Sequence, residues 1–284
     1  MPVVATNTAA NSALRFLNNN SSMAASSVSK LASGSRIVKA SDDAAGLAIG
    51  TRLNADVTVL TQAGINASQG ASVVQVADGG LARIGDVLQR MKALAAQSLS
   101  GVPTDTERAF IDAEYQALLE EIDDMATTTR FNGASLLDGS SAAAATANYF
   151  VGTDVNDTIT VDFTNLAASA ANFTATALGL TASGADGVAS VTAAEGAMAA
   201  IDDAIDMVSE ARANAGALIS RFEFRGQQIA TSLENIDAAK SAIMDVDLAA
   251  EQSKLVSSQV LVQAAVSAVS QANQIPQSLL RVLQ

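Results

Sequence analysis

Apolar residues recur every seven positions along four long stretches of this 284-residue chain. One of the two longest series consists of Leu53, Leu60, Ala67, Val74, Leu81, Leu88 and Ala95. A seven-residue repeat places its members along one stripe of an α-helix, and such a stripe is buried only against another helix. At 1.5 Å per residue, a helix of ~57 residues over 42–98 would be a rod of roughly 85 Å. The spacing therefore predicts long helices packed along their lengths.

Both ends of the chain carry a repeat of the same kind, which we call the terminal seam. Its members are Leu17, Ala24, Leu31 and Val38 near the start, and Leu248, Leu255, Val262 and Val269 near the end. Leu283 falls on the same count after an expected break at Pro276. The expected helices, about 5–33 and 247–282, each need a partner helix. The residues alone leave two partners open, namely the other end of the same chain and copies of the chain.

Two helix starts have polar signals. Ser41 is expected to cap the helix over 42–98, with Asp42 and Asp43 in its first turn, where the helix dipole favours negative charge. Adjacent carboxylates diverge on a helix, so we favour capping over a metal or acid–base pair. Thr104 and Glu107 have the spacing of a capping box at the start of a helix over about 105–129.

The middle of the chain changes character after Asn132-Gly133, which predicts a tight turn. The run from Thr158 to Phe163 alternates polar and apolar residues as a strand does, and 149–151 is its expected partner. The rest of the segment up to about 190 is rich in Ala, Thr and Gly, and we expect it to be exposed.

Helical periodicity returns near 192. A second rod is predicted from Ile201, Val208, Ala215, Phe222, Ile229, Ile236 and Ile243. The count changes between Ile243 and Leu248, which predicts a bend near Asp245–Asp247. The predicted fold is mainly α: a long antiparallel helical hairpin of coiled-coil type, with paired terminal helices, paired rods, and a small β-hairpin region in a middle that projects from the far end.

Absent residue types exclude several functions. The chain has no Cys and no His, which removes thiolate chemistry, the Ser-His triad and the common zinc sites. We therefore predict no enzymatic activity, cofactor or metal; the acidic cluster at 120–124 is expected to be a solvated face. The net charge of −13 argues against nucleic acid as a partner. Neither a cleavable secretory signal nor insertion in a membrane is expected.

Five segments together resemble bacterial flagellins: Leu31–Ile37, Ser41–Ile49, Gly70–Gln97, Arg130–Leu137 and Ser270–Leu280. They occur in the family's order and cover both ends of the chain. The resemblance implies a structural subunit that self-assembles into the extracellular flagellar filament for motility. It implies a short form that lacks large outer domains.

The resemblance also implies a domain division. Residues 1–40 with 246–284 would form an inner terminal coiled-coil domain. Residues 41–140 with 192–245 would form a helical rod domain, and 141–191 a variable, exposed β-hairpin and loop region in which the hairpin lies on the rods. The assembly seam would then include Leu17, Leu31, Leu248, Leu255, Val262 and Val269.

Partners follow from the resemblance as well. It implies export through the flagellar type III apparatus, with an export chaperone, the filament cap and hook-junction proteins as further partners. Arg90, Leu94 and Glu114 match positions that contact Toll-like receptor 5 in this family, although Ala93 departs from the family's frequent Glu. Packing between subunits is an equal alternative for Arg90 and Glu114.

Three other functions are alternatives to a filament subunit. A hook–filament junction protein of related architecture is the main alternative, because its termini are similar to those of a filament subunit. An inserted zinc protease would need His residues, which the chain lacks. A ligand-binding role at the cell surface has no pocket motif to support it. The sequence does not decide whether Ser and Thr residues of 140–190 carry O-linked sugars.

Overall fold

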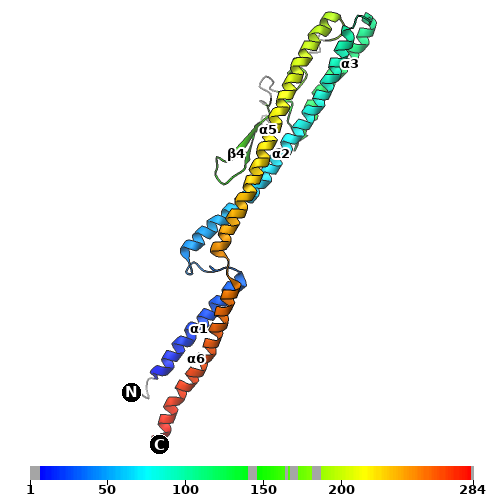
Figure 1. Ribbon diagram of the computed structural model, residues 1–284. Coiled ribbons are helices and arrows are strands. Elements are labelled where there is room, and N and C mark those ends of the chain that lie inside the picture. Colours follow the sequence, from blue (N-terminus) through cyan, green and yellow to red (C-terminus); the bar gives the residue numbers. More distant parts are fainter. Residues whose placement is uncertain (1–6, 140–145, 164–165, 167–171, 181–186, 283–284) are drawn as a thin grey trace. The chain divides into compact units, whose positions relative to one another are not determined.

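The computed structural model describes residues 7–139, 146–163, 166, 172–180 and 187–282. The helices are α1 (Thr8–Ser33), α2 (Ala44–Leu99), α3 (Asp105–Thr128), α5 (Val191–Met244) and α6 (Leu248–Val282). The strands are β1 (Arg130–Phe131), β2 (Ala134–Ser135), β3 (Thr146–Phe150) and β4 (Thr158–Asp162). The predicted fold class, long antiparallel helices with a small β region, is confirmed (Figure 1).

The chain forms two compact units. Unit 1 contains Met1–Val57 and Glu234–Gln284, and unit 2 contains Thr58–Leu233. Both boundaries fall within helices, because α2 and α5 each contribute to both units. The three-part domain division stays a prediction.

In unit 1, the first and last helices form an antiparallel pair (Figure 1). Asn7 caps α1 by accepting a hydrogen bond from the Ala10 amide, and its Nδ2 donates to the Ala272 carbonyl, 2.8 Å away near the end of α6. At the other end of α1, Ser27 meets Glu251 in the first turn of α6. The chain termini therefore pair with each other, as the seam predicted.

The helix is interrupted between α5 and α6 at Asp245–Asp247, where the change of count predicted a bend. Gly34 ends α1 in the left-handed region, at φ 70°. Its carbonyl accepts from the Val246 amide, and the Arg36 amide donates to the Met244 carbonyl at 2.6 Å. Backbone hydrogen bonds between the two linkers thus fix the bend.

The cap of α2 is Asp43, so the prediction of Ser41 as the N-cap is wrong. Asp43 Oδ1 accepts from the Gly46 amide at 2.9 Å, and the helix begins at Ala44. Asp42 instead closes the preceding turn by accepting from the amides of Lys39 and Val38. These hydrogen bonds lower the pKa of Asp42. The two adjacent carboxylates therefore have separate roles: Asp42 closes the turn and Asp43 caps the helix.

α6 continues through Pro276, so the break predicted there is wrong. A proline inside a helix removes one backbone donor, yet helical backbone persists to Val282. Among the described residues, the stretch Leu248–Gln274 has the length and composition of a membrane span. That is weak evidence for a span, and the absence of membrane insertion stays a prediction.

In unit 2, α2 and α5 pack antiparallel (Figure 1). Contacts recur at intervals along both helices: the ring of Phe222 lies against Gly70, Asp78 pairs with Arg212 at 3.0 Å, and Lys92 pairs with Asp202. The predicted heptad members within this unit are buried, namely Leu60, Ala67, Val74, Leu81, Leu88, Ala95, Ile201, Val208, Ala215, Phe222 and Ile229. The predicted pairing of the two rods, α2 and α5, is therefore confirmed within unit 2.

α3 begins with the predicted capping box. Thr104 Oγ1 accepts from the Glu107 amide, and the Glu107 carboxylate accepts from the Thr104 amide at 2.7 Å. Buried Arg108 donates to the Ser98 carbonyl at 3.1 Å, which ties the start of α3 to the end of α2. A buried stripe that includes Tyr115 continues along α3.

The Asn132-Gly133 turn joins β1 and β2 as predicted. Asn132 has φ 49° and Gly133 has φ 81°, so both central residues are in the region that a two-residue hairpin turn requires. β1 and β2 pair antiparallel, with Phe131 opposite Ala134.

The predicted hairpin is also present, but it lies along the helices. β3 and β4 pair antiparallel, with Phe150 opposite Thr158. Tyr149 meets the Phe222 ring edge-on, with 5.4 Å between ring centroids, and Asn66 Nδ2 donates to the Phe150 carbonyl at 3.0 Å. Contacts with both α2 and α5 place the hairpin on their pair, as the resemblance to flagellins implied. The projection of the middle from the far end, inferred from periodicity alone, is wrong for these strands.

The segment after β4 contributes to the core. Leu166, Phe173, Ala175, Leu178, Leu180 and Val188 are buried. α3 anchors the backbone, because Asp123 accepts from the Ala175 amide at 2.7 Å and Asp112 from the Val188 amide at 2.8 Å. The expectation of an exposed segment is therefore wrong for these residues.

Candidate assembly surface

The α1–α6 pair has two heptad tracks, and the deeper one was not predicted. On α6 the buried residues are Glu251, Ser258, Ala265 and Ala272, seven apart. Three of the four, Ser258, Ala265 and Ala272, have small side chains, which allow the helix backbones to approach closely. A second seven-residue series, offset by three or four from the leucines, was the sequence signal that could have revealed this track.

The predicted seam forms the second track on α6. Leu255, Val262 and Val269 are half-buried, whereas Leu248, at the start of α6, is 59% exposed. On α1, Leu17, Ala24 and Leu31 are half-buried, and Val38 lies beyond the helix and is exposed. Most of the seam is thus used within the chain, between its own first and last helices.

A buried polar contact fixes the register of this pair. Ser27 Oγ donates to Glu251 Oε1 at 2.7 Å, and Lys254 donates to the other carboxylate oxygen at 3.2 Å. The Ser27 hydrogen bond, assisted by Lys254 and the charge of Lys30, holds the pKa of Glu251 below its ordinary value, although burial acts in the opposite direction. A shift by one heptad would leave this buried carboxylate without its serine donor.

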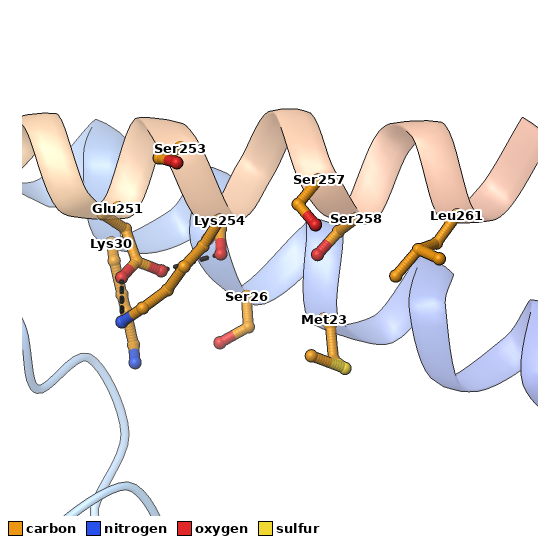
Figure 2. A pocket seen from close by; sticks show the side chains of 10 residues that line it. Met23, Ser26, Lys30, Glu251, Ser253, Lys254, Ser257, Ser258 and Leu261 are labelled. Carbon is orange, nitrogen blue, oxygen red and sulfur yellow. Dashed lines mark hydrogen bonds and ion pairs between the residues drawn. The ribbon is translucent and has the colours of Figure 1, made fainter.

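An open groove of about 490 Å³ runs between the two helices beside Glu251. Figure 2 shows the Lys30 and Lys254 side chains extending past the carboxylate at one end, and Met23 and Leu261 at the other. Serines line the space between them: Ser26, Ser27, Ser253, Ser257 and Ser258. The groove is hollow because these side chains are short.

Large apolar side chains are exposed on both helices of the pair, and two of them, Met23 and Leu261, lie at the groove. Those on α1 are Leu14, Phe16, Met23 and Val28, and those on α6 are Leu248, Val256, Val260, Leu261 and Val266, all exposed. Phe16 and Val260 are 57% and 58% exposed. Apolar groups gathered in this way on a paired helix surface mark a binding surface for another protein.

The three predicted receptor contacts lie together in unit 2, but they differ in exposure. Arg90 on α2 donates two hydrogen bonds to Glu114 Oε1 on α3, at 2.9 and 2.6 Å, and both side chains are exposed. Leu94 is buried between the helices. A partner protein could therefore reach the Arg90–Glu114 ion pair, whereas Leu94 is part of the core.

Within the described ranges, no group of three or more Asp and Glu residues could hold a metal ion. The contacts of the α1–α6 pair are those of helix packing: apolar stripes, one buried carboxylate and its donors.

Two family profiles match the chain, one at each end. The bacterial flagellin N-terminal helical region matches residues 4–142, and the bacterial flagellin C-terminal helical region matches residues 198–283. The chain belongs to the bacterial flagellin family.

Full-length relatives agree with this family. The chain is 37% identical to a flagellin of Halalkalibacterium halodurans, over 89% of each chain. It is 33% identical to the flagellar filament 30.7 kDa core protein of Treponema maltophilum, over 95% of each. A solved structure assigned to a flagellar hook-associated protein of Vibrio parahaemolyticus shares the fold, with TM-score 0.54 at 16% identity, over 72% of this chain and 100% of the other.

Membership of this family establishes the general role. Flagellins are structural proteins and not enzymes, and this chain is a structural subunit of the flagellar filament outside the cell. It polymerises with copies of itself. The short form predicted from the sequence is confirmed, since relatives of similar length match nearly end to end.

Proposed function

We propose that copies of this chain assemble through the outer faces of the α1–α6 pair, which would form the inner domain of the filament. The observation that carries the proposal is the exposed apolar surface on α1 and α6, represented by Phe16 and Val260. The terminal seam is largely occupied within the chain, so the outer faces are what remains for neighbouring copies. Covering them removes apolar area from water, the main driving force of association.

The finer features of the family complete the proposal. The rod domain, 41–140 with 192–245, makes the next shell of contacts between copies, and the β3–β4 hairpin faces outward. The subunit leaves the cell through the type III apparatus. An export chaperone covers the apolar faces of α6 before export, and the filament cap and hook-junction proteins contact the same helices at the two ends of the filament.

Fewer residues are proposed to contact the receptor directly than the sequence suggested. Toll-like receptor 5 would meet the exposed Arg90–Glu114 ion pair on α2 and α3. Leu94 would act indirectly, since it is buried and supports the packing of the helices that present the pair.

Seeded polymerisation tests the assembly proposal. Purified monomer would be mixed with filament fragments, and elongation followed by light scattering and electron microscopy. Val260→Asp places a charge on an exposed site of the monomer, so it should leave the monomer folded and prevent elongation. Val155→Asp is the matched control, because this valine is 82% exposed in the turn between β3 and β4. Equal elongation of both variants would overturn the proposal.

Two further variants separate the surfaces of α6. Deleting 250–284 should leave a monomer that cannot elongate seeds. Val262→Asp changes a half-buried seam position, so it should both loosen the α1–α6 pair and block assembly. Wild-type chains that bind seeds without elongating them would instead support the junction-protein alternative.

A further inference from the structure

The amino-acid composition makes methionine the side chain that an oxidant modifies first. The chain has seven methionines and no Cys, His or Trp. Peroxides oxidise the sulfur atoms of proteins, and in a chain without thiols these are the thioether sulfurs of methionine. The effect of a peroxide on this protein therefore depends on where its methionines lie.

Met23 on α1 is the one exposed methionine among the residues that the structure describes. It is 57% exposed, whereas Met91 is fully buried. The other methionines in the described ranges are half-buried, namely Met125, Met198, Met207 and Met244. Since oxidation of a side chain follows its exposure, a low dose of peroxide should modify Met23 first.

Met23 lies on an apolar part of the α1–α6 pair. It lines one end of the groove together with Leu261 (Figure 2). Phe16 precedes it by seven residues, so the two side chains share one stripe of α1, and Phe16 is equally exposed. This stripe is part of the surface through which we propose that copies assemble.

Oxidation changes the chemistry of this stripe. The Met23 sulfur donates an electron pair to one oxygen of hydrogen peroxide, so an S–O bond forms and the O–O bond breaks. The proton of the transferred oxygen moves to the departing hydroxide, which leaves as water. The sulfur is thereby oxidised by two electrons to a sulfoxide, which is polar where the thioether was apolar. Because the side chain faces water in the monomer, the fold of the pair should tolerate this change.

We propose that Met23 is a modification site at which oxidation by peroxide stops a subunit from joining the filament. A neighbouring copy that covers the stripe would take the sulfoxide oxygen out of water, which is unfavourable unless that copy supplies a donor. The apolar thioether carries no such cost. The inference rests on the proposed assembly through α1 and α6, and it adds a chemical control of that assembly.

The modification is reversible while the subunit is free. Methionine sulfoxide reductases reduce both epimers of the sulfoxide. Thiols supply the two electrons and are oxidised to a disulfide, and the oxygen leaves as water. Met23 is exposed in the monomer, so such an enzyme could reach it there. Once a neighbour covers Met23, both the peroxide and the reductase are excluded, so the site responds to oxidation only before assembly.

Seeded elongation of oxidised monomer tests the inference. The monomer is treated with hydrogen peroxide until peptide mass spectrometry shows a sulfoxide at Met23 with the other methionines unmodified. The critical concentration for elongation should then rise by about tenfold, because assembly buries an acceptor without a donor. Treatment with both reductases and dithiothreitol should restore the value of the untreated protein. Circular dichroism melting should show that the oxidised monomer is folded.

Two variants identify the residue responsible. Met23→Leu keeps a large apolar side chain but removes the sulfur, so its critical concentration should be the same before and after peroxide. Met207→Leu is the matched control, because it removes a half-buried sulfur from α5 and should leave the response to peroxide intact. Each variant is compared with its own untreated sample, so an effect of leucine on elongation itself does not enter the comparison.

Oxidised wild-type chain that elongates like untreated chain would overturn the inference, and so would a Met23→Leu variant that is as sensitive to peroxide as wild type. Val260→Asp separates this failure from that of the proposed assembly. If Val260→Asp blocks elongation while oxidation of Met23 does not, the assembly through α1 and α6 stands and only its control by oxidation is wrong. If Val260→Asp also elongates normally, the proposed assembly itself is wrong.

Discussion

Two glycines of α2 should respond oppositely to the same substitution. A Cβ added at Gly70 would lie 2.6 Å from two ring atoms of Phe222. That ring is buried, and Tyr149 packs edge-on against it, so it has no free space into which to move. At Gly79, no described atom lies within 4 Å of the added Cβ. Gly70→Ala therefore tests close packing, and Gly79→Ala is its control.

The expected magnitudes follow from two opposing effects. Alanine is favoured over glycine in a helix by about 1 kcal/mol, so Gly79→Ala should stabilise unit 2 by about that amount. At Gly70 the same gain is opposed by overpacking, which typically costs about 1–3 kcal/mol. Gly70→Ala should therefore leave unit 2 about 1 kcal/mol less stable than wild type, within a range of roughly 0–2 kcal/mol.

Thermal and urea unfolding of the monomer, followed by circular dichroism, measure this difference. Each kcal/mol corresponds to roughly 2–4 °C in Tm for a unit of this size. Adding Phe222→Leu to Gly70→Ala should recover part of the loss, because the smaller side chain makes room for the methyl group. If Gly70→Ala were as stable as Gly79→Ala, the close approach of α2 and α5 at this point would be refuted.

Other predictions concern the α1–α6 pair and the start of α3. The pKa of Glu251 in the folded chain lies below its ordinary value of 4.5, so its contribution to the stability of unit 1 is full above that pH. This contribution is lost as the pH falls through the lowered pKa. The Tm of unit 1 should therefore fall in that acid range, and it should fall less in the Ser27→Ala variant. A fall of equal size in both proteins would show that the contact does not stabilise the pair. Thr104→Ala should destabilise unit 2 by about 1 kcal/mol through loss of the cap, whereas Thr106→Ala, two residues on, should change the Tm little.

The long helices could be predicted because their burial repeats every seven residues. Leu60 to Ala95 on α2 and Ile201 to Ile229 on α5 are apolar wherever the helix meets its partner, so pattern and packing coincide. The capping box at Thr104 and the turn at Asn132-Gly133 were equally predictable, because each depends on neighbouring residues alone.

The deeper track of α6 could not be found in the same way. Its members include Glu251 and Ser258, which a search for apolar repeats passes over. Burial there depends on close approach of α1 and on the Ser27 donor, some 224 residues away in the sequence. The candidate assembly surface was therefore assigned to the seam residues, although much of that seam faces the chain's own helix.

Two other errors have separate causes. Ser41 and Asp43 are both good caps, and the turn formed by Asp42 determines which of them begins the helix. The segment after β4 has little periodicity, so the sequence pattern does not predict its burial. Phe173 and Leu180 are buried in a segment whose backbone is held by hydrogen bonds such as that from the Ala175 amide to Asp123. Local hydrogen bonds of the turn decide the first case, and long-range contacts decide the second.

The central claim is that copies assemble through the outer faces of the α1–α6 pair. A filament map from electron microscopy, at a resolution that shows side chains, would test it most directly. In such a map we expect Phe16 and Val260 to be buried against neighbouring copies, while Ser27 and Glu251 stay paired within each chain. Filaments in which Phe16 and Val260 face solvent would contradict it.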